Sequence, residues 1–235
     1  DPSNYGKVIT SVDLHKESGN GVINVFGASI QFAPDCAEPT DVLVENITSD
    51  SADITWTAGN TETEWEVLFG EAGFDPEIEG TMMSDNDGEI GVSISGLSAS
   101  TAYDVYVRAI CGEGNESIWV LESFFTLPSN DECDNAIELV VNEDLECTNT
   151  TPGATVGATA SDLGDDEDVT GTPNNDVWFT FTATSASHPI SLSNIEAIIG
   201  TSTDMAMALY DGTEGCEILT LVDDSDPNSF TATGL

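Results

Sequence analysis

The sequence predicts an all-β protein of tandem β-sandwiches. Three observations lead to this fold class. Apolar residues alternate with polar ones along most of the chain, no segment shows the spacing of an amphipathic helix of three turns, and clusters of Gly, Asn, Asp and Ser separate the alternating runs. The chain has 235 residues, of which 39% are hydrophobic, so it can form one or two domains with packed cores.

The first alternating runs lie at the N-terminus. Residues 7–14 alternate with period two, residues 17–21 supply a turn, and a second run extends over residues 22–32. This pattern predicts a β-hairpin within residues 1–33. Because two strands alone are marginally stable in water, we expect the hairpin to be the end of a preceding domain.

A first complete domain is predicted over residues 34–128. Strands recur there at regular intervals, and about seven short strands in about 90 residues are typical of a β-sandwich. The alternating positions are Ala52, Ile54 and Trp56, then Trp65, Val67 and Phe69, then Val92 and Ile94, then Tyr103, Val105, Val107 and Ala109. We expect the core to be built on Trp56, Val67, Tyr103, Val105 and Val107.

A second all-β domain is predicted over residues 129–235, after a boundary at Pro128-Ser129-Asn130-Asp131. Its alternating positions are Ile137, Leu139 and Val141, then Val177, Phe179 and Phe181, then Ile190 and Leu192, then Met205, Met207 and Leu209, then Leu219 and Leu221. The last run covers residues 229–232. A sandwich of this size needs one or two more strands to close it, so we expect the chain to be a segment of a longer polypeptide.

The charge excludes several classes of partner. The chain carries 44 acidic and 3 basic side chains, for a net charge of -41 at pH 7. Binding of nucleic acid requires Lys and Arg to displace counterions from phosphates, and anionic membrane surfaces attract basic segments for the same reason. No run of 18 apolar residues is present, so membrane insertion is not expected.

The acidic residues of the second domain gather in clusters that predict calcium binding. With almost no Lys or Arg to pair them, a cation that prefers oxygen ligands would relieve their repulsion. The predicted ligands are Asp165, Asp166, Asp168, Asp176, Asp211, Asp223, Asp224 and Asp226. Their spacing does not fit the EF-hand, and a solvated acidic surface remains an equal alternative.

Five cysteines predict disulfides in an oxidising compartment. None lies in a CxxC pair and only two histidines are present, which argues against zinc. We expect Cys133 to pair with Cys147, closing a small loop at the start of the second domain. Cys216 would then be free or paired outside this segment.

Residues 36–127 resemble a fibronectin type III domain. The likeness rests on Trp56 in the run 51–56 and on residues 96–109, Gly-Leu-Ser-Ala-Ser-Thr-Ala-Tyr-Asp-Val-Tyr-Val-Arg-Ala. The resemblance implies that Tyr103 is the corner tyrosine, whose hydroxyl group bonds back to the backbone. Cys36 and Cys111 resemble a version common in secreted proteins of Bacteroidota, which implies that they form a disulfide.

Residues 129–235 resemble a cysteine-containing relative of the bacterial pre-peptidase C-terminal domain, which has a jelly-roll-like sandwich. The runs that carry the likeness are 130–137, 175–181 and 208–212. The closing strands of that family are missing here. Both families are modules of secreted or surface proteins, often cargo of type IX secretion, which implies an extracellular or cell-surface location.

No catalytic or cofactor-binding residues are predicted. Neither histidine lies in a Ser-His-Asp arrangement, no glycine-rich loop joins a strand to a helix, and pairs of carboxylates are expected by chance among so many acids. Trp119 and Trp178 would stack on a sugar ring if they faced solvent. We favour the alternative that both pack on a sandwich face or at a domain junction.

We therefore expect a non-catalytic segment of a large secreted or surface bacterial protein, acting as a rigid spacer or adhesin. Its partners would be neighbouring domains, other copies of the chain, or surface glycans and proteins. Two alternatives remain open. One is the accessory, substrate- or carbohydrate-binding region of a secreted hydrolase. The other is a subunit of a self-assembling surface filament, in which residues 1–32 of one copy complete the second domain of the next by strand addition.

Overall fold

The computed structural model describes residues 36–144, 146–161, 175–225, 229–233 and 235. The chain divides into two compact units, Asp1–Ala33 and Pro34–Leu235. The predicted hairpin within residues 1–33 lies outside the described residues. The described residues form β-strands and one short 3-10 turn, η2 (Cys133–Asn135), with no α-helix. The all-β prediction is confirmed.

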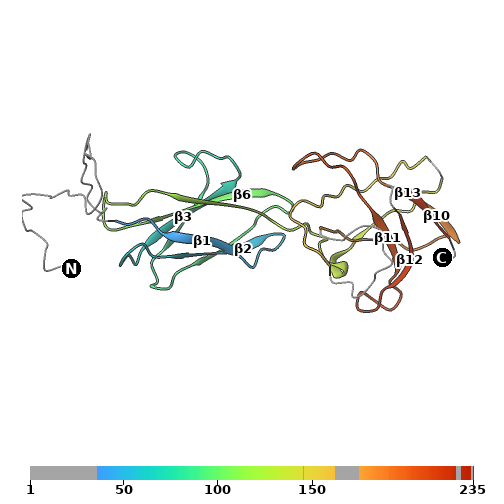
Figure 1. Ribbon diagram of the computed structural model, residues 1–235, viewed down its shortest axis with the longest axis horizontal. Helices are drawn as coiled ribbons and strands as arrows, with labels where there is room; N and C mark the ends of the chain where they lie inside the picture. The colour runs from blue at the N-terminus through green and yellow to red at the C-terminus, as the bar shows by residue number, and fades with distance from the viewer. Residues whose placement is uncertain (1–35, 145, 162–174, 226–228, 234) are drawn as a thin grey trace, which may run out of the picture. The chain divides into compact units, whose positions relative to one another are not determined.

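Seven strands between residues 36 and 127 form two antiparallel sheets (Figure 1). One sheet has the order β1-β2-β5, and the other has the order β4-β3-β6-β7. The strand bounds are β1 (Thr40–Glu45), β2 (Ser51–Thr57), β3 (Trp65–Glu71), β4 (Thr81–Asp85), β5 (Val92–Ser95), β6 (Ala102–Ala109) and β7 (Val120–Phe125). β4 includes the polar residues Ser84 and Asp85, which pair with Glu66 and Trp65 of β3.

The core of this sandwich consists of the inward-facing residues of both sheets. Trp56, Val67, Tyr103, Val105 and Val107 all belong to it, as the alternation predicts. The indole rings of Trp56 and Trp65, from opposite sheets, meet edge to face with centroids 5.7 Å apart. The predicted core is confirmed, because the alternating apolar positions of β2 and β6 face inward, although Asp104 between two of them is also buried.

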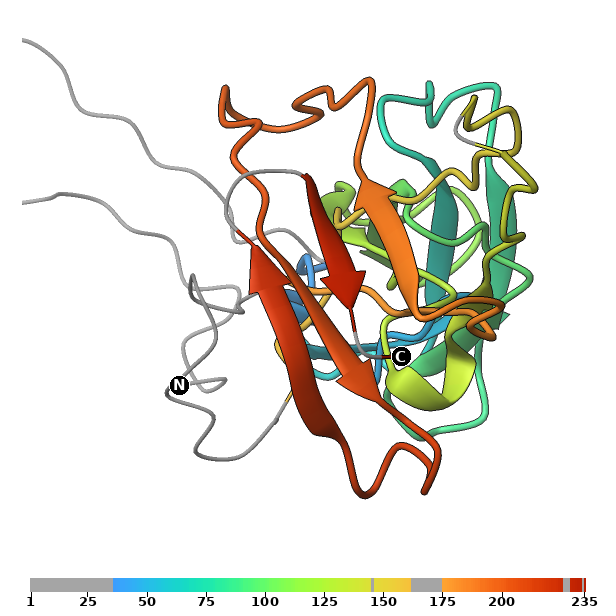
Figure 2. The ribbon, with the colours of Figure 1, turned by 90° about the vertical axis from the view of Figure 1, so that its right-hand side faces the viewer.

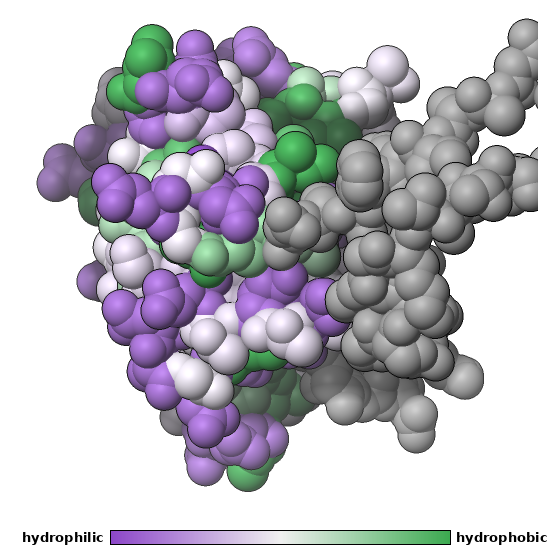
Figure 3. All heavy atoms as spheres, turned by 90° about the vertical axis from the view of Figure 1, so that its left-hand side faces the viewer, coloured by the Kyte–Doolittle hydropathy of each residue, from purple (hydrophilic) through white to green (hydrophobic). Residues whose placement is uncertain are grey.

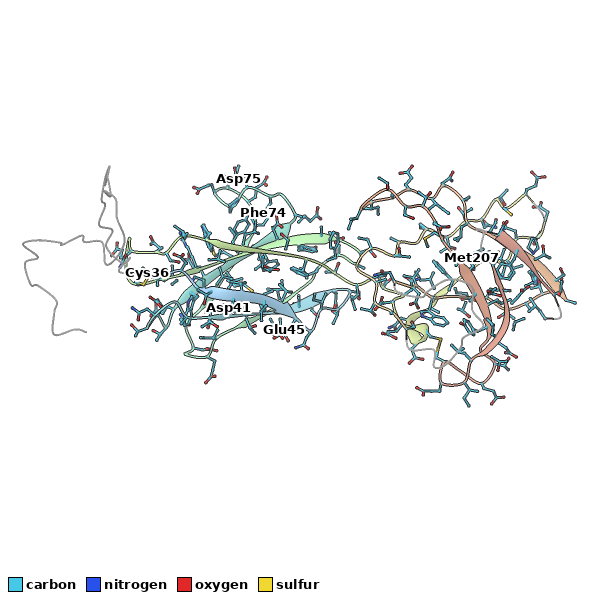
Figure 4. The ribbon with its side chains drawn as sticks, viewed as in Figure 1. Cys36, Asp41, Glu45, Phe74, Asp75 and Met207 are labelled. Atoms are coloured by element: carbon cyan, nitrogen blue, oxygen red, sulfur yellow. A yellow bond between two sulfur atoms is a disulfide. The ribbon has the colours of Figure 1, made fainter. Side chains whose placement is uncertain are left out.

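The outer face of the four-stranded sheet carries a second group of aromatic residues. Phe74, labelled in Figure 4, lies in the loop between β3 and β4. Its ring packs edge to face on Tyr106 with centroids 5.4 Å apart. Gly70 makes room for it, because a Cβ atom there would lie 2.9 Å from Phe74 Cδ1.

The described residues after Leu127, which we call the second part of the chain, form three two-stranded sheets, and the strands of the two antiparallel ones are seen in Figure 2. The parallel pair is β8 (Ile137–Glu138) with β9 (Phe179–Thr180), and the antiparallel pairs are β10 (Ser187–Ser191) with β13 (Ser229–Thr233) and β11 (Met207–Asp211) with β12 (Thr220–Ser225). The runs predicted at 137–141 and 177–181 pair over only two residues each. Among the described residues after Pro128, only Ala158 and Ala232 are buried apolar side chains, so this part has no core like the first.

One predicted disulfide is confirmed and the other is wrong. Cys36 is bonded to Cys111, 75 residues away. Cys133 is bonded to Cys216 rather than to Cys147, and Cys147 is free and exposed. The loop between β11 and β12 carries Cys216 to η2, with the two Cα atoms 5.8 Å apart. The spacing along the chain favours the short loop, but strand pairing decides which cysteines meet.

The end of the molecule seen in Figure 3 is mostly hydrophilic, with apolar residues scattered among the polar ones. In the part of the chain that the structure describes, no helix is long and apolar enough to cross a membrane.

Candidate functional site

The segment from Thr126 to Asp131 connects the two parts of the chain and is bonded to both. On the first side, Thr126 is fully buried, and its hydroxyl group donates to the Ser98 carbonyl at 2.6 Å and accepts from the Thr101 N–H at 3.0 Å. The Leu127 N–H donates to the Thr48 carbonyl at 3.1 Å. These bonds attach the segment to the loops at the end of the sandwich.

On the second side, two buried polar side chains hold the same segment. Asn130 donates from Nδ2 to the Trp178 carbonyl at 2.7 Å, and its own carbonyl accepts from the Trp178 N–H at 2.8 Å. The Asp131 carboxylate accepts from both the N–H and the hydroxyl group of Thr159, each at 2.8 Å. Both side chains are at most 5% exposed, so these bonds are shielded from water.

A glycine permits close approach of the chain at this junction. Gly157 has φ of +77°, and a Cβ atom there would lie 2.4 Å from the Thr126 carbonyl oxygen. Only Pro128 and Ser129 separate the residues that bond to the two parts. We call Thr126–Asp131 with Gly157 and Thr159 the junction. The sequence marked Asn130 and Asp131 as a boundary, but it contains no signal for Thr159, because that residue lies 28 positions further along the chain.

A cavity of about 170 Å³ lies beside Trp178. Its wall includes the indole of Trp178, the hydroxyl-bearing Ser161, and the disulfide between Cys133 and Cys216. Three acidic residues also line it: Glu132, Asp134 and Glu217. We call this the Trp178 cavity. It lies in the second part of the chain, beside one of the two tryptophans that would stack on a sugar ring if they faced solvent.

Hydrogen bonds hold the indole of Trp178 in place. Its Nε1–H donates to the hydroxyl oxygen of Ser161 at 2.9 Å, and Ser161 in turn donates to Asp176 at 2.6 Å. The ring of Tyr210 packs against it with centroids 5.8 Å apart. Trp178 is half-buried, so it is partly packed, as we expected, and partly available to a ligand.

Trp119 lies over the outer face of the first sandwich, covered by a basic side chain. The guanidinium carbon of Arg108 is 4.3 Å from the centre of the Trp119 ring. The same guanidinium donates from Nε and Nη2 to Glu66 Oε2, at 2.8 and 2.6 Å. Trp119 is therefore packed on a sandwich face, the alternative that the sequence favoured.

A second cavity, of about 400 Å³, lies beside the Cys36–Cys111 disulfide and has the residues of the 60–64 loop in its wall. Its acidic residue Glu62 accepts hydrogen bonds from the N–H groups of Ala37 and Asn60. Burial raises the pKa of Glu62, but the backbone N–H bonds outweigh it and hold the pKa below the usual range. This carboxylate stabilises the loop, and no aromatic ring faces the cavity.

The structure does not bring the described members of the predicted calcium set together. Asp165, Asp166, Asp168 and Asp226 lie outside the described residues. Asp176 accepts two bonds from Ser161, while Asp211 accepts from the hydroxyl and N–H groups of Thr213, which together lower the Asp211 pKa. Asp223 accepts from the N–H of Asp224. Among the described residues, no three acidic, histidine or cysteine side chains converge as a metal site.

The described histidine, His188, stabilises a local turn. Its Nε2 accepts from the N–H groups of Thr184 and Ser185, each at 3.1 Å. A ring nitrogen that accepts two backbone hydrogens is not available as a general base. His15 lies outside the described residues.

Comparison with known proteins identifies the first sandwich. Residues 37–123 match the family model of the fibronectin type III domain. A search of curated proteins found no match.

Among solved structures, a computationally redesigned β-sandwich protein is 25% identical, covering 38% of this chain and 94% of that one, with a TM-score of 0.34. The fibronectin type III domain of human collagen α-1(XX) is 20% identical, covering 43% and 93%, with a TM-score of 0.37. A two-domain segment of chicken tenascin is 17% identical, covering 37% and 49%, with a TM-score of 0.34.

Proposed function

We propose that this chain is a rigid, non-catalytic spacer and adhesive segment of a secreted or surface protein. Residues 37–123 match the fibronectin type III domain, a module that multidomain extracellular proteins use as a spacer or binding unit. The observation that carries the proposal is the junction. Its residues are hydrogen-bonded to both the sandwich and the second part, with two residues between the two sets of bonds.

A spacer holds neighbouring domains at a fixed distance and orientation only if the junctions between its domains resist bending. A linker of Gly and Ser behaves as a flexible coil, whereas the junction contains Pro128 and the buried, hydrogen-bonded residues Asn130 and Asp131. Freeing more of the segment than Pro128 and Ser129 would break charge-assisted bonds to the Asp131 carboxylate, which contribute roughly 1.5–3 kcal/mol each. Thermal motion at about 0.6 kcal/mol does not supply that energy.

Two features support an extracellular setting. Both disulfides close long loops, and such bonds persist in oxidising compartments. The high negative charge keeps chains apart and dissolved in salty surroundings. The bacterial origin, the jelly-roll-like form of the second part and export by type IX secretion rest on the sequence resemblance. Reading the complete gene tests them.

Distances across the junction test the proposed rigidity. Spin labels are attached at E45C and T220C in a Cys147→Ser background, because both positions are exposed and lie on opposite sides of the junction. We expect one narrow distance distribution by pulsed electron resonance. Asp131→Ala should broaden it, because both Thr159 bonds are lost.

Asp211→Ala is the matched control. It removes the same charge from the second part, but that carboxylate bonds only within its own turn. Thr159→Val, which keeps the backbone bond and loses the hydroxyl bond, serves if Asp131→Ala does not fold. A broad distribution in the parent protein, or one unchanged by both variants, would show that the junction is not what orients the two parts.

A further inference from the structure

We propose that the Trp178 cavity binds a positively charged side chain, arginine or lysine, presented by a partner protein. The cavity combines one aromatic ring with three acidic residues, Glu132, Asp134 and Glu217. The face of an indole ring attracts cations, and ionised carboxylates only accept hydrogen bonds. These two features together select a group that carries positive charge and several N–H donors.

The same chain already shows this chemistry inside one molecule. Arg108 is held between the Trp119 ring, 4.3 Å from its guanidinium carbon, and the Glu66 carboxylate. The Trp178 cavity offers the same two kinds of group. Arg108 is the only lysine or arginine among the described residues, and it is engaged elsewhere. The cation that fits the cavity must therefore come from outside the described part of the chain.

The cavity is organised in advance. Ser161 fixes the indole edge, and two hydrogen bonds with Asn130, one to its side chain and one to its carbonyl, fix the main chain of Trp178. The Cys133–Cys216 disulfide ties the segment that carries Glu132 and Asp134 to the segment that carries Glu217. A site whose walls are already held loses less entropy when a ligand enters.

Charge argues against the other ligand classes. An anionic group would meet three carboxylates in the cavity and a chain with a net charge of -41. That field instead attracts basic partners and accelerates their approach. Metal binding is not favoured, because no metal-binding group of acidic, histidine or cysteine side chains occurs among the described residues. A neutral sugar would use the ring but not the charge, and it becomes an outcome of the test.

The test uses the intact chain and small probes. N-acetyl-L-arginine methylamide is titrated at constant ionic strength while the Nε1–H signal of Trp178 is followed by nitrogen-15 correlation spectroscopy. Trp178→Phe assigns that signal by its loss. We expect a saturable shift, and we expect N-acetyl-L-citrulline methylamide, which has nearly the same shape without the charge, to bind roughly tenfold more weakly or worse, as the loss of one charge-assisted hydrogen bond predicts.

Two variants with equal changes in charge separate the site from the general field. Glu132→Gln/Asp134→Asn/Glu217→Gln should weaken binding of the arginine probe by roughly tenfold or more. Glu77→Gln/Glu89→Gln/Glu113→Gln removes three exposed charges from the first sandwich and should change binding less than about twofold, because exposed charges at long range are screened.

Three results would overturn the proposal. The first is equal binding of the arginine and citrulline probes. The second is equal weakening by the two triple variants. The third is a shift of Trp178 by methyl β-D-glucoside without one by the arginine probe, which would identify a sugar site. The junction experiment can fail while this inference stands, because the two use different residues and readouts.

Discussion

The phenolic oxygen of Tyr103 accepts a hydrogen bond from the backbone N–H of Ser98 at 2.9 Å, five residues earlier in the chain. The ring of Tyr103 also stacks on Phe124 of β7, with centroids 5.8 Å apart. One side chain thus fastens the loop before β6 to the sandwich core. The corner tyrosine that the sequence resemblance implied is confirmed.

Tyr103→Phe should therefore lower the free energy of unfolding by about 1–3 kcal/mol, because it leaves the Ser98 N–H partly buried without its acceptor. Chemical denaturation measures the change. Tyr106→Phe is the control, since its ring lies on the outer face of the sheet beside Phe74. Its effect should stay within about 0.5 kcal/mol, as for most surface changes. Equal losses in the two variants would show that the corner bond adds nothing.

Trp56→Ala should lower stability by about 3–5 kcal/mol, the usual cost of truncating a large core side chain. Trp56 is 5% exposed and packs on Trp65. Trp56→Phe should cost less, because it keeps an aromatic ring and removes an indole N–H for which the described residues provide no acceptor. Thermal melting compares the three proteins. If Trp56→Ala melts within one or two degrees of the parent, Trp56 is not a core residue.

Peptide mapping without reduction should recover Cys36 joined to Cys111 and Cys133 joined to Cys216, with Cys147 open to alkylation. The residue separations of 75 and 83 correspond to about 4–5 kcal/mol of loop entropy for each bond, in the chain-entropy model. Cys133→Ser/Cys216→Ser should therefore destabilise the second part strongly, whereas Cys147→Ser should not. Recovery of a peptide that joins Cys133 to Cys147 would contradict the assignment.

Two aspartates of the first sandwich should respond oppositely to pH. Burial raises the pKa of Asp85, and the nearby Asp87 charge adds to this against a bond from the Gly91 N–H. Hydrogen bonds from the Ser93 hydroxyl and the Asn46 amide lower the pKa of Asp53. A carboxyl group whose pKa is higher in the folded than in the unfolded protein stabilises the fold at low pH, and this stabilisation is lost as pH rises. A carboxyl group whose pKa is lower in the folded protein stabilises the fold at higher pH, and this stabilisation is lost as pH falls.

The melting temperature of Asp85→Asn, relative to the parent, should therefore rise as pH increases from about 3 to 6. That of Asp53→Asn should fall at lower pH, as pH rises from about 2 to 4 and approaches the ordinary aspartate value, because the parent gains the Asp53 contribution as the carboxylate ionises. If the melting temperatures of the two variants, relative to the parent, change with pH in the same direction, the pKa values of Asp85 and Asp53 are not shifted in opposite directions.

Calcium binding by the acidic loops of the second part stays a prediction. Its proposed ligands Asp165, Asp166, Asp168 and Asp226 lie outside the described residues, and the described ones bond to their neighbours. At the weak affinity of extracellular modules, about 10⁻⁴–10⁻³ M, 10 mM calcium should stabilise the fold by about 1–3 kcal/mol. The melting temperature is compared with sodium at matched ionic strength and with chelator. If calcium raises the melting temperature no more than sodium does, the acidic residues form only a charged surface and do not bind calcium.

The first sandwich could be predicted closely from the sequence because its signals are local. Burial alternates along β2 and, apart from the buried Asp104, along β6, so Trp56 and Val105 could be placed in the core before any contact was known. The Leu97-to-Tyr103 spacing marks the corner for a similar reason, since both ends of the Tyr103–Ser98 bond lie within one turn of chain. The ends of β4 were less predictable, because cross-strand pairing with β3 extends it into Asp85.

In the second part of the chain, local sequence patterns predicted the strands and the acidic surface but not the contacts between distant residues. Alternation by itself determined that it is built from strands, and composition by itself determined that its surface is acidic. Only the tertiary structure decided that Cys133 meets Cys216, that Asp131 binds Thr159, and that Trp178 lines a cavity with Glu132 and Glu217. Each of these contacts joins residues at least 28 positions apart. Alternation specifies which face of a strand a side chain occupies, but the pairing of strands decides which distant residue it meets.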